Sequence, residues 1–579
     1  MSERSIIDDS HRINSVNPQR NASHIGENIE EEYTDNPDDP ELIQANIQTV
    51  SISSGANRSN NNYQPRIDCS LSTQSSFEDG GSKLEVTNKL LFMITKDNLP
   101  YRTVEKEGFK VFIKSILPLY KIPCRKTIAN LIQEKYEVLC NIIRDQLRKV
   151  VDISLTTDIW TDQLNTKSYL GLTAHYIFDN KHKSVTIGVT QLYERHSAEN
   201  IKKWLRIIIK EWGVNTESIL VIVSDSGSNI KKAIKDEFGP EKHLPCFAHA
   251  LNLITSKVIE SNNIHVIVKK VKSIVCHFKK SIIAADELRK VTELKLIQSV
   301  ETRWNSTYEM LSRFIELSDK IGCILLQYPT APAMINATEL HIVKEFVVLL
   351  KPFQEATRII SGENYLTASK VIPIVNTLKV ALIEAVPETE TGKQMKELLL
   401  EEFNSRFYDI EDTMILALST ILDPRFKTVH FNSNSACSNS VNKISSALSR
   451  THLDAPAENS VTRINATGFW SYHETLVSRI RSEEPLNVQE NEISDMLRYY
   501  LIQPPVKMDT DPINFWQKND TPLAKLGKKY LAAIATSVPC ERLFSKAGQI
   551  MTEARNRLSG DHLQQLLFLG SLSKEEWNF

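Results

Sequence analysis

The amino-acid sequence predicts a mixed α/β core that is followed by a long, all-helical region. Three segments rich in β-branched and aromatic residues, 152–160, 168–178 and 183–193, are separated by short polar joins, which is the pattern of an antiparallel meander. A helical pattern, the nearly all-apolar segment 218–225 and a second helical pattern come next, as expected of a buried strand between two helices. After residue 260, apolar residues recur at helical spacing over more than two hundred residues.

Local signals set the limits of several of these elements. Ser197 is placed to cap the helix expected over 197–213, and Gly213 is placed to end it. Near the end of the chain we expect helices over 539–555 and 560–572. The second of these has an apolar stripe formed by Leu563, Leu566, Leu567 and Leu569.

The chain divides into five predicted parts. Residues 1–80 are rich in Ser, Asn, Asp and Glu and have few aromatic residues, so they cannot bury enough surface to offset their ordering entropy, and we expect a disordered acidic tail. The other parts are a helical N-terminal unit at 81–150, the first part of the α/β core at 151–260, a helical region at 261–520 and a C-terminal region at 521–579. Within the helical region, the Ser/Asn-rich segment 432–467 predicts a disordered loop.

The composition excludes several classes of protein. A formal net charge of -2 and a pI near 6.7 give no global basic signature, so any nucleic-acid binding has to depend on local patches. Eight scattered cysteines never form CxxC, which argues against a disulfide scaffold and against a zinc finger. The sequence shows neither a secretory signal nor about 18 uncharged apolar residues in a row. We therefore expect an intracellular protein that is not in a membrane.

Three acidic residues stand in distinctive settings. Asp158 is expected to close the first strand, Asp225 to close the fourth, and Glu541 to lie on a late helix. Two-metal phosphoryl chemistry needs carboxylates that hold ions about 3.5–4 Å apart, and magnesium suits such ligands. Ordinary structural roles at strand ends, in turns and in a first helical turn explain the same residues, and spacing alone favours those roles.

The sequence motifs around these three acidic residues are more specific than their spacing. The strings TTDIWTDQLNTKSYLGLTAHYI, VSDSGSNIKKAI, LPCFAHALNLI, ETRWNSTYEML, ILDPRFK and SVPCERLFSKAGQIMTEARNRLSGDHLQQLLFL occur in this order. Together they closely resemble the hAT superfamily of DNA transposases and its host-adopted relatives, the zinc finger BED domain-containing proteins. The resemblance covers about residues 84–572.

The resemblance implies an RNase H-like mixed-sheet core that is interrupted by a large all-helical insertion domain and followed by a helical C-terminal dimerisation region. It places a DDE triad on Asp158, Asp225 and Glu541, which would bind two Mg²⁺ or Mn²⁺ ions for DNA strand cleavage and transfer. DNA is the implied partner, a homodimer or higher homo-oligomer through the C-terminal helices is the implied assembly, and the nucleus is the implied location.

Further site residues follow from the same resemblance. Trp304 is similar to a tryptophan that stacks on a flipped base in the family, and Arg303 beside it would contact a phosphate. The alternative for Trp304 is a core residue just before a helix whose capping box is Ser306 with Glu309.

Two more groups of residues have competing interpretations. His243, Cys246 and His249 form an HxxCxxH row whose spacing does not favour zinc. The resemblance places Cys246 and His249 beside the active site as supporting residues, and a satisfied core histidine is the alternative. The basic stretch that includes Lys269, Lys270 and Lys272 either follows a DNA backbone or forms a solvated helix face.

One family feature is missing from the printed sequence. The BED finger needs a CxxC followed by paired histidines, but the first cysteine is Cys69 and no second one lies within finger distance. Recognition of a DNA sequence therefore needs another source. Three hypotheses remain: a metal-dependent transposase or nuclease core, a non-catalytic nuclear regulator that dimerises through 523–572, and a structural scaffold without DNA affinity.

Overall fold

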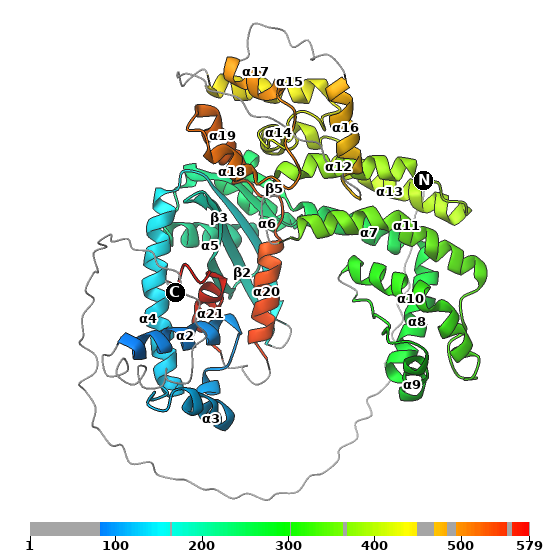
Figure 1. Ribbon diagram of the computed structural model, residues 1–579, viewed down its shortest axis with the longest axis horizontal. Helices are drawn as coiled ribbons and strands as arrows, with labels where there is room; N and C mark the ends of the chain where they lie inside the picture. The colour runs from blue at the N-terminus through cyan, green and yellow to red at the C-terminus, as the bar shows by residue number, and fades with distance from the viewer. Residues whose placement is uncertain are drawn as a thin grey trace, which may run out of the picture. The chain divides into compact units, whose positions relative to one another are not determined.

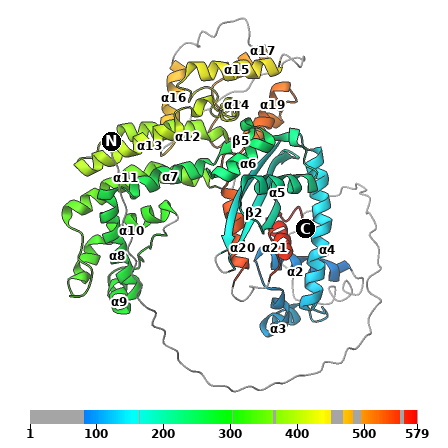
Figure 2. The same ribbon diagram turned by 180° about the vertical axis from the view of Figure 1, so that it is seen from behind.

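The computed structural model describes residues 81–162, 165–300, 303–362, 368–448, 468–482, 494–552 and 558–577. Figures 1 and 2 show this chain from opposite sides. The predicted tail at 1–80 lies outside the described residues. Among the helices that the structure describes, none is long and apolar enough to cross a membrane.

A five-stranded mixed sheet forms the centre of the core. The strands, in chain order, are β1 (Ile153–Asp162), β2 (Lys167–Phe178), β3 (Lys181–Leu192), β4 (Ile219–Ser224) and β5 (His243–Pro245). They lie in the spatial order β3-β2-β1-β4-β5. Strand β2 is antiparallel to both β1 and β3, whereas β4 is parallel to both β1 and β5. The predicted meander and mixed α/β core are therefore confirmed.

The first strand is longer than predicted. It pairs with β2 as far as Asp162, opposite Lys167, whereas its pairing with β4 ends where Thr156 lies opposite Val223. The prediction that Asp158 closes the strand is wrong, because the meander continues beyond the end of β4. Asp158 nevertheless lies two residues past the last β1–β4 pair, and Asp225 lies two residues past it on the neighbouring segment.

Helices cover the sheet and form the N-terminal unit. The side chain of Ser197 accepts a hydrogen bond from the Asn200 backbone, and Gly213 has a φ of +64°, so both predicted limits of the helix between them are confirmed. The helices around the core are α2 (Gly81–Lys96), η1 (Tyr101–Glu105), α3 (Glu107–Ile116), α4 (Arg125–Lys149), α5 (Ala198–Glu211), η2 (Thr216–Ser218), α6 (Ser228–Phe238) and η3 (Pro240–Lys242).

A long series of helices follows β5 and ends at Leu531. These helices are α7 (Phe247–Ile259), α8 (Asn262–Lys280), α9 (Ile282–Val291), α10 (Trp304–Leu325), α11 (Ala337–Ile360), α12 (Ala368–Glu384), α13 (Glu390–Phe407), η4 (Ile410–Asp412), α14 (Met414–Ile421), α15 (Asn434–Leu448), α16 (Ser471–Ser482), α17 (Asp495–Ile502), α18 (Pro512–Gln517) and α19 (Pro522–Leu531). One buried apolar cluster joins many of them to β4 and β5.

Part of the predicted disordered loop at 432–467 is a helix. Residues Asn434–Leu448 form α15, and Val441, Ile444 and Leu448 are buried in a cluster with α14 and α19. This burial outweighs the Ser/Asn-rich composition, because packing of an apolar face supplies most of the stability of a helix in a protein. The remainder of the loop, 449–467, lies outside the described residues.

The C-terminal part of the chain returns to the sheet later than predicted. Helix α19 packs on α14 and α15 within the helical region, although 521 was the predicted boundary. The core is completed by α20 (Val538–Ile550), which contacts β1 and β2, and by α21 (Gly560–Ser571), which contacts β3. Figure 1 shows α20 beside β2. The predicted leucine stripe of α21 is buried within the chain: Leu563, Leu566, Leu567 and Leu569.

Candidate active site

Asp158 lies on the face of β1 that meets α20. Alternate residues of a strand share a face, and both Thr156 and Trp160 contact α20. The Asp158 side chain is partly buried, and its Oδ1 accepts a hydrogen bond from the Ile159 backbone N–H at 2.8 Å.

The electrostatic surroundings connect Asp158 to the other two acids. Burial raises the pKa of Asp158 to about 7, the hydrogen bond from Ile159 lowers it, and the negative charges of Asp225 and Glu541 raise it. A charge affects a pKa in this way only when it is close. Asp158 is therefore within electrostatic reach of both other predicted catalytic residues.

Asp225 follows β4 directly. Its Oδ1 accepts a hydrogen bond from the Gly227 backbone N–H at 3.1 Å, at the start of α6. This bond matches the structural role that the sequence also allowed, since a turn aspartate often binds a backbone N–H two residues on. The second carboxylate oxygen is not used in that bond.

Glu541 lies in the first turn of α20, where a carboxylate favours the helix dipole. The residue keeps exposed surface. Burial of its carboxylate raises the pKa of Glu541, and the nearby positive groups of Arg303, His249 and Arg542 lower it. Two guanidinium groups and an imidazole therefore lie within electrostatic reach of the third acid.

Cys540 fixes the start of α20 to β1. Its thiol donates to the Thr156 carbonyl oxygen at 3.2 Å and lies 3.3 Å from the Thr156 hydroxyl and 3.7 Å from the Thr173 hydroxyl. Burial raises the pKa of Cys540 to about 12, so the thiol is protonated and can donate. This contact places the neighbouring Glu541 beside the sheet.

Cys246 joins the other two segments of the site. Its backbone N–H donates to Ser224 at 2.7 Å, and its sulfur accepts from the backbone N–H groups of Ser537 at 3.2 Å and His249 at 3.4 Å. The segment before Asp225 and the segment before Glu541 are thereby connected through one residue. These contacts make Cys246 a structural link between the two segments, and its part in catalysis stays a prediction.

The histidines of the HxxCxxH row have separate surroundings. His243 Nε2 lies 3.1 Å from the Ser224 hydroxyl, and burial together with nearby lysines lowers the pKa of His243 to about 4. His249 is partly exposed beside Glu541 instead. Within the described ranges, no three or more His, Cys, Asp or Glu side chains are arranged to hold a metal ion. The three acids thus share one electrostatic neighbourhood, and they suit Mg²⁺ by their chemistry, but in this arrangement they do not converge into a finished ligand set.

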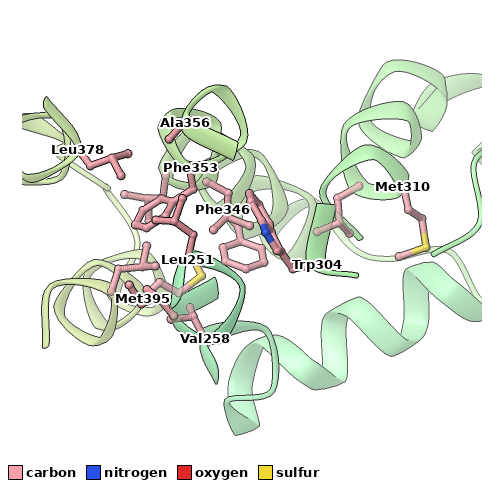
Figure 3. Close-up of a cluster of buried hydrophobic side chains, with 14 of the residues drawn as sticks. Leu251, Val258, Trp304, Met310, Phe346, Phe353, Ala356, Leu378 and Met395 are labelled. Atoms are coloured by element: carbon pink, nitrogen blue, oxygen red, sulfur yellow. The ribbon is translucent and has the colours of Figure 1, made fainter. Parts of the chain in front are cut away.

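Arg303 and Trp304 differ in their exposure. Arg303 is exposed and lies near Glu541, as a phosphate contact would require. Trp304 is only 4% exposed and belongs to the buried cluster shown in Figure 3. An indole without an open face cannot stack on a base in this arrangement, so the core alternative describes it correctly. The predicted capping box is wrong, because α10 begins at Trp304 itself, and the Ser306 hydroxyl bonds to Val300 and Arg303.

The three lysines of α8 do not form one exposed row. Lys269 is exposed, Lys272 is partly buried, and Lys270 pairs with Glu339 of α11. The paired lysine is less available to a phosphate, which weakens the prediction of a continuous DNA-binding stripe.

Sequence reasoning missed two cationic residues that follow Glu541 on α20. Arg542 donates a hydrogen bond to the Ser361 carbonyl oxygen at the end of α11. Lys546, one helical turn later, has a pKa that burial and the charge of Arg542 lower. Both stand in the same CERLFSK string as the acid, and a helical projection of that string would have placed Lys546 one turn from Arg542.

Three family models match this chain. They are described as the ZBED1 RNase-like domain, at residues 156–250, the ZBED1 RNase-like helical domain, at 244–347, and the hAT family C-terminal dimerisation region, at 496–572.

The proteins with similar sequences include a zinc finger BED domain-containing protein and a transposase. Zinc finger BED domain-containing protein 4 of Homo sapiens is 25% identical over 91% of this chain and 47% of its own length. Putative AC transposase of Zea mays is 25% identical over 83% of the chain and 64% of its own length. Putative transcriptional regulator tpeD of Talaromyces stipitatus is 22% identical over 84% of the chain and 62% of its own length. The chain thus spans about half to two thirds of the length of these relatives.

Proposed function

We propose that this chain, a relative of the hAT transposases, is a dimeric nuclear DNA-binding protein that cuts and transfers DNA strands with Asp158, Asp225 and Glu541. The observation that supports the proposal is that Asp158 lies within electrostatic reach of both Asp225 and Glu541, which come from distant segments of the chain. Two cysteines connect those segments, with Cys246 joining the second to the third and Cys540 joining the third to the first.

Each acid has a part in this proposal. Asp158 would be the shared ligand, because its carboxylate is the one influenced by both of the others. Asp225 and Glu541 would supply the other carboxylate ligands. Bound there, Mg²⁺ or Mn²⁺ would activate the attacking oxygen and stabilise the leaving oxygen of a phosphodiester.

Cationic residues would hold the DNA strand. Arg303 is exposed beside Glu541, and Arg542 and Lys546 follow on α20. Cations in such positions bind phosphates without reading sequence. Lys269 of α8 would extend this contact, whereas Lys270 would contribute less because it pairs with Glu339.

Nicking of a supercoiled plasmid tests the catalytic proposal. The purified chain should nick the plasmid with Mn²⁺ and not with EDTA, and Asp158→Asn should lose at least about a hundredfold in rate, since the substitution removes a central metal ligand. Asp179→Asn is the matched control, because Asp179 lies in an exposed β2–β3 turn with a φ of +49° that asparagine tolerates. Equal nicking by wild type and Asp158→Asn would remove the triad from the mechanism.

A second candidate function is that of a non-catalytic regulator. The absence of a finished set of three metal ligands among the described residues favours it, and one relative is named as a putative transcriptional regulator. It predicts DNA binding and dimerisation without metal-dependent nicking. The plasmid assay combined with a DNA-binding measurement therefore separates the two candidates.

Assembly depends on the region that matches the hAT dimerisation model, and this match indicates homo-oligomerisation. The α21 leucines are buried within the chain, whereas Tyr499 and Ile502 of α17 are 49% and 66% exposed. These two side chains would therefore lie in the interface. Replacing both with Ser should shift the dimer to monomer in sedimentation, and an unchanged dimer would place the interface elsewhere.

A further inference from the structure

Helix α20 lies along β1 with matching spacing. Cys540 contacts Thr156, Phe544 stacks on Trp160, and Gly548 approaches the same tryptophan. Four residues of a helix rise about 6 Å and two residues of a strand about 6.6 Å. The helix from Cys540 to Gly548, about 12 Å long, therefore lies along the strand from Thr156 to Trp160, about 13 Å long, with Asp158 between the two strand contacts.

Gly171 of β2 lies under the middle of this helix. It is the cross-strand partner of Asp158. A Cβ atom built on Gly171 would lie 2.7 Å from Phe544 Cζ and 3.3 Å from Leu543 Cδ2, and the first distance is too short for two carbon atoms in contact. Any side chain at this position would push against α20.

The Phe544 ring has little room to move away. It is buried and stacks on Trp160 with ring centres 5.7 Å apart, and Trp160 stacks in turn on Tyr169 at 5.9 Å. Leu543 next to it is also buried. A close-packed interior transmits such a displacement because it contains little free volume. The helix itself would have to shift.

We propose that Gly171 is a positioning residue for the site: the lack of a side chain there sets the distance between the strand that carries Asp158 and the helix that carries Glu541. The inference rests on the proposed function for its catalytic meaning. The position of α20 is a separate physical quantity that can be measured without any activity.

The thiol of Cys540 reports on that position. It is fully buried against Thr156, so iodoacetamide should not label it in the folded wild type. In Gly171→Ala, labelling of Cys540, read by mass spectrometry of the whole folded chain, should be at least about tenfold faster, because a displaced α20 opens more often. Exposed Cys124 and Cys323 serve as internal references.

Gly188→Ala is the matched control. A Cβ atom there would lie 2.9 Å from Ile208 Cγ2 of α5, and therefore crowds a helix other than α20 on the same sheet. This variant should lose stability as well but keep Cys540 protected. Unchanged labelling in Gly171→Ala, or equal acceleration in Gly188→Ala, would overturn the inference.

A second-site substitution tests the contact itself. Leucine at 544 is smaller and more flexible than phenylalanine, so Gly171→Ala with Phe544→Leu should protect Cys540 better than Gly171→Ala alone. If Gly171→Ala does not fold, recovery of a folded protein in the double variant supports the contact, and failure to recover counts against it.

Binding of Mn²⁺ separates the inference from the proposed function. If the wild type binds Mn²⁺ through the three acids, Gly171→Ala should bind it more weakly and Gly188→Ala should bind it normally. Normal binding by Gly171→Ala would overturn the link to the site. If the wild type does not bind Mn²⁺, the metal-dependent function fails, and the labelling of Cys540 still decides whether Gly171 positions α20.

Discussion

The Cys540 sulfur lies 3.2 Å from the Thr156 carbonyl oxygen, so two residues that are 384 positions apart in sequence meet beneath the candidate site. The Thr156 hydroxyl also lies 3.3 Å from this sulfur and 3.3 Å from His175 Nε2. A small buried network therefore supports the strand next to Asp158 and the helix next to Glu541 at the same time.

Loss of the Thr156 hydroxyl should destabilise the protein. Thr156→Val keeps the shape of the side chain but leaves His175 and Cys540 without this partner, which costs about 1–3 kcal/mol in the free energy of unfolding. Urea denaturation measures it. Thr157→Val is the control, since the buried Thr157 hydroxyl has no hydrogen-bond partner among the residues that the structure describes, and this variant should be neutral or more stable. Equal losses in both variants would contradict the role of the network.

Neutralising Asp158 should stabilise the metal-free protein. Its pKa is raised to about 7 in the folded state, so above pH 7 the charge must be held in an unfavourable place, whereas well below pH 4 the group is neutral in both folded and unfolded chains. Asp158→Asn should therefore gain about 1–2 kcal/mol at pH 8, with the gain fading as the pH falls from 7 to 4. Thermal denaturation in EDTA at several pH values checks this, and a gain that does not vary with pH would contradict it.

Low pH should destabilise the helical region because of His430 and His473. His430 Nε2 lies 2.8 Å from His473 Nδ1, and burial lowers the pKa of the first to about 3 and of the second to about 4, with Asp423 raising the latter and Arg425 lowering it. Between pH 6.5 and about 4 the unfolded histidines bind protons that the folded ones do not. Stability is therefore lost as the pH falls, by up to about 1.4 kcal/mol per pH unit for each histidine.

The variant His473→Gln removes one of these protonations. Its melting temperature should fall less between pH 7 and pH 5 than that of the wild type, as scanning fluorimetry can measure. The same pH dependence in both proteins would rule out the histidine pair as the cause.

The negative charge of residues 1–80 should weaken DNA binding. Residues 1–80 contain 14 Asp and Glu and 5 Lys and Arg, for a net charge of -9. Residues 81–579 contain 57 Asp and Glu and 64 Lys and Arg, for a net charge of +7. The chain that lacks 1–80 should bind generic DNA more tightly and with a steeper salt dependence, because it repels phosphates less. Replacing Glu30, Glu31 and Glu32 with Gln in the full chain should shift the affinity in the same direction. Equal affinity of the full and shortened chains would contradict the prediction.

Local sequence patterns predicted the core well. The three strands of the meander are defined by β-branched and aromatic residues, and the helix between Ser197 and Gly213 by its capping residues, all of which act on near neighbours. The position of Asp158 within β1 was missed because the strand continues as far as β2 remains paired with it. That length is set by a partner and not by the strand itself.

Tertiary packing explains the other differences. The helix at 434–448 has a composition typical of loops, and only contact with α14 and α19 buries its apolar side. Trp304 has the same sequence signature whether its ring is exposed or buried, so only the cluster around it distinguishes the two cases. The contacts of Cys540 and Gly171 join segments hundreds of residues apart, and no local pattern encodes them.

The order of the chain also has a consequence for synthesis. Asp158 and Asp225 precede the long series of helices, and Glu541 follows it, so a ribosome completes the first two well before the third. Until α20 emerges, the side of β1 and β2 that Cys540 and Phe544 later cover is open to water, and such apolar surface favours aggregation of a partly made chain. A premature stop anywhere among α7–α19 therefore yields a protein without the third acid and with an uncovered sheet.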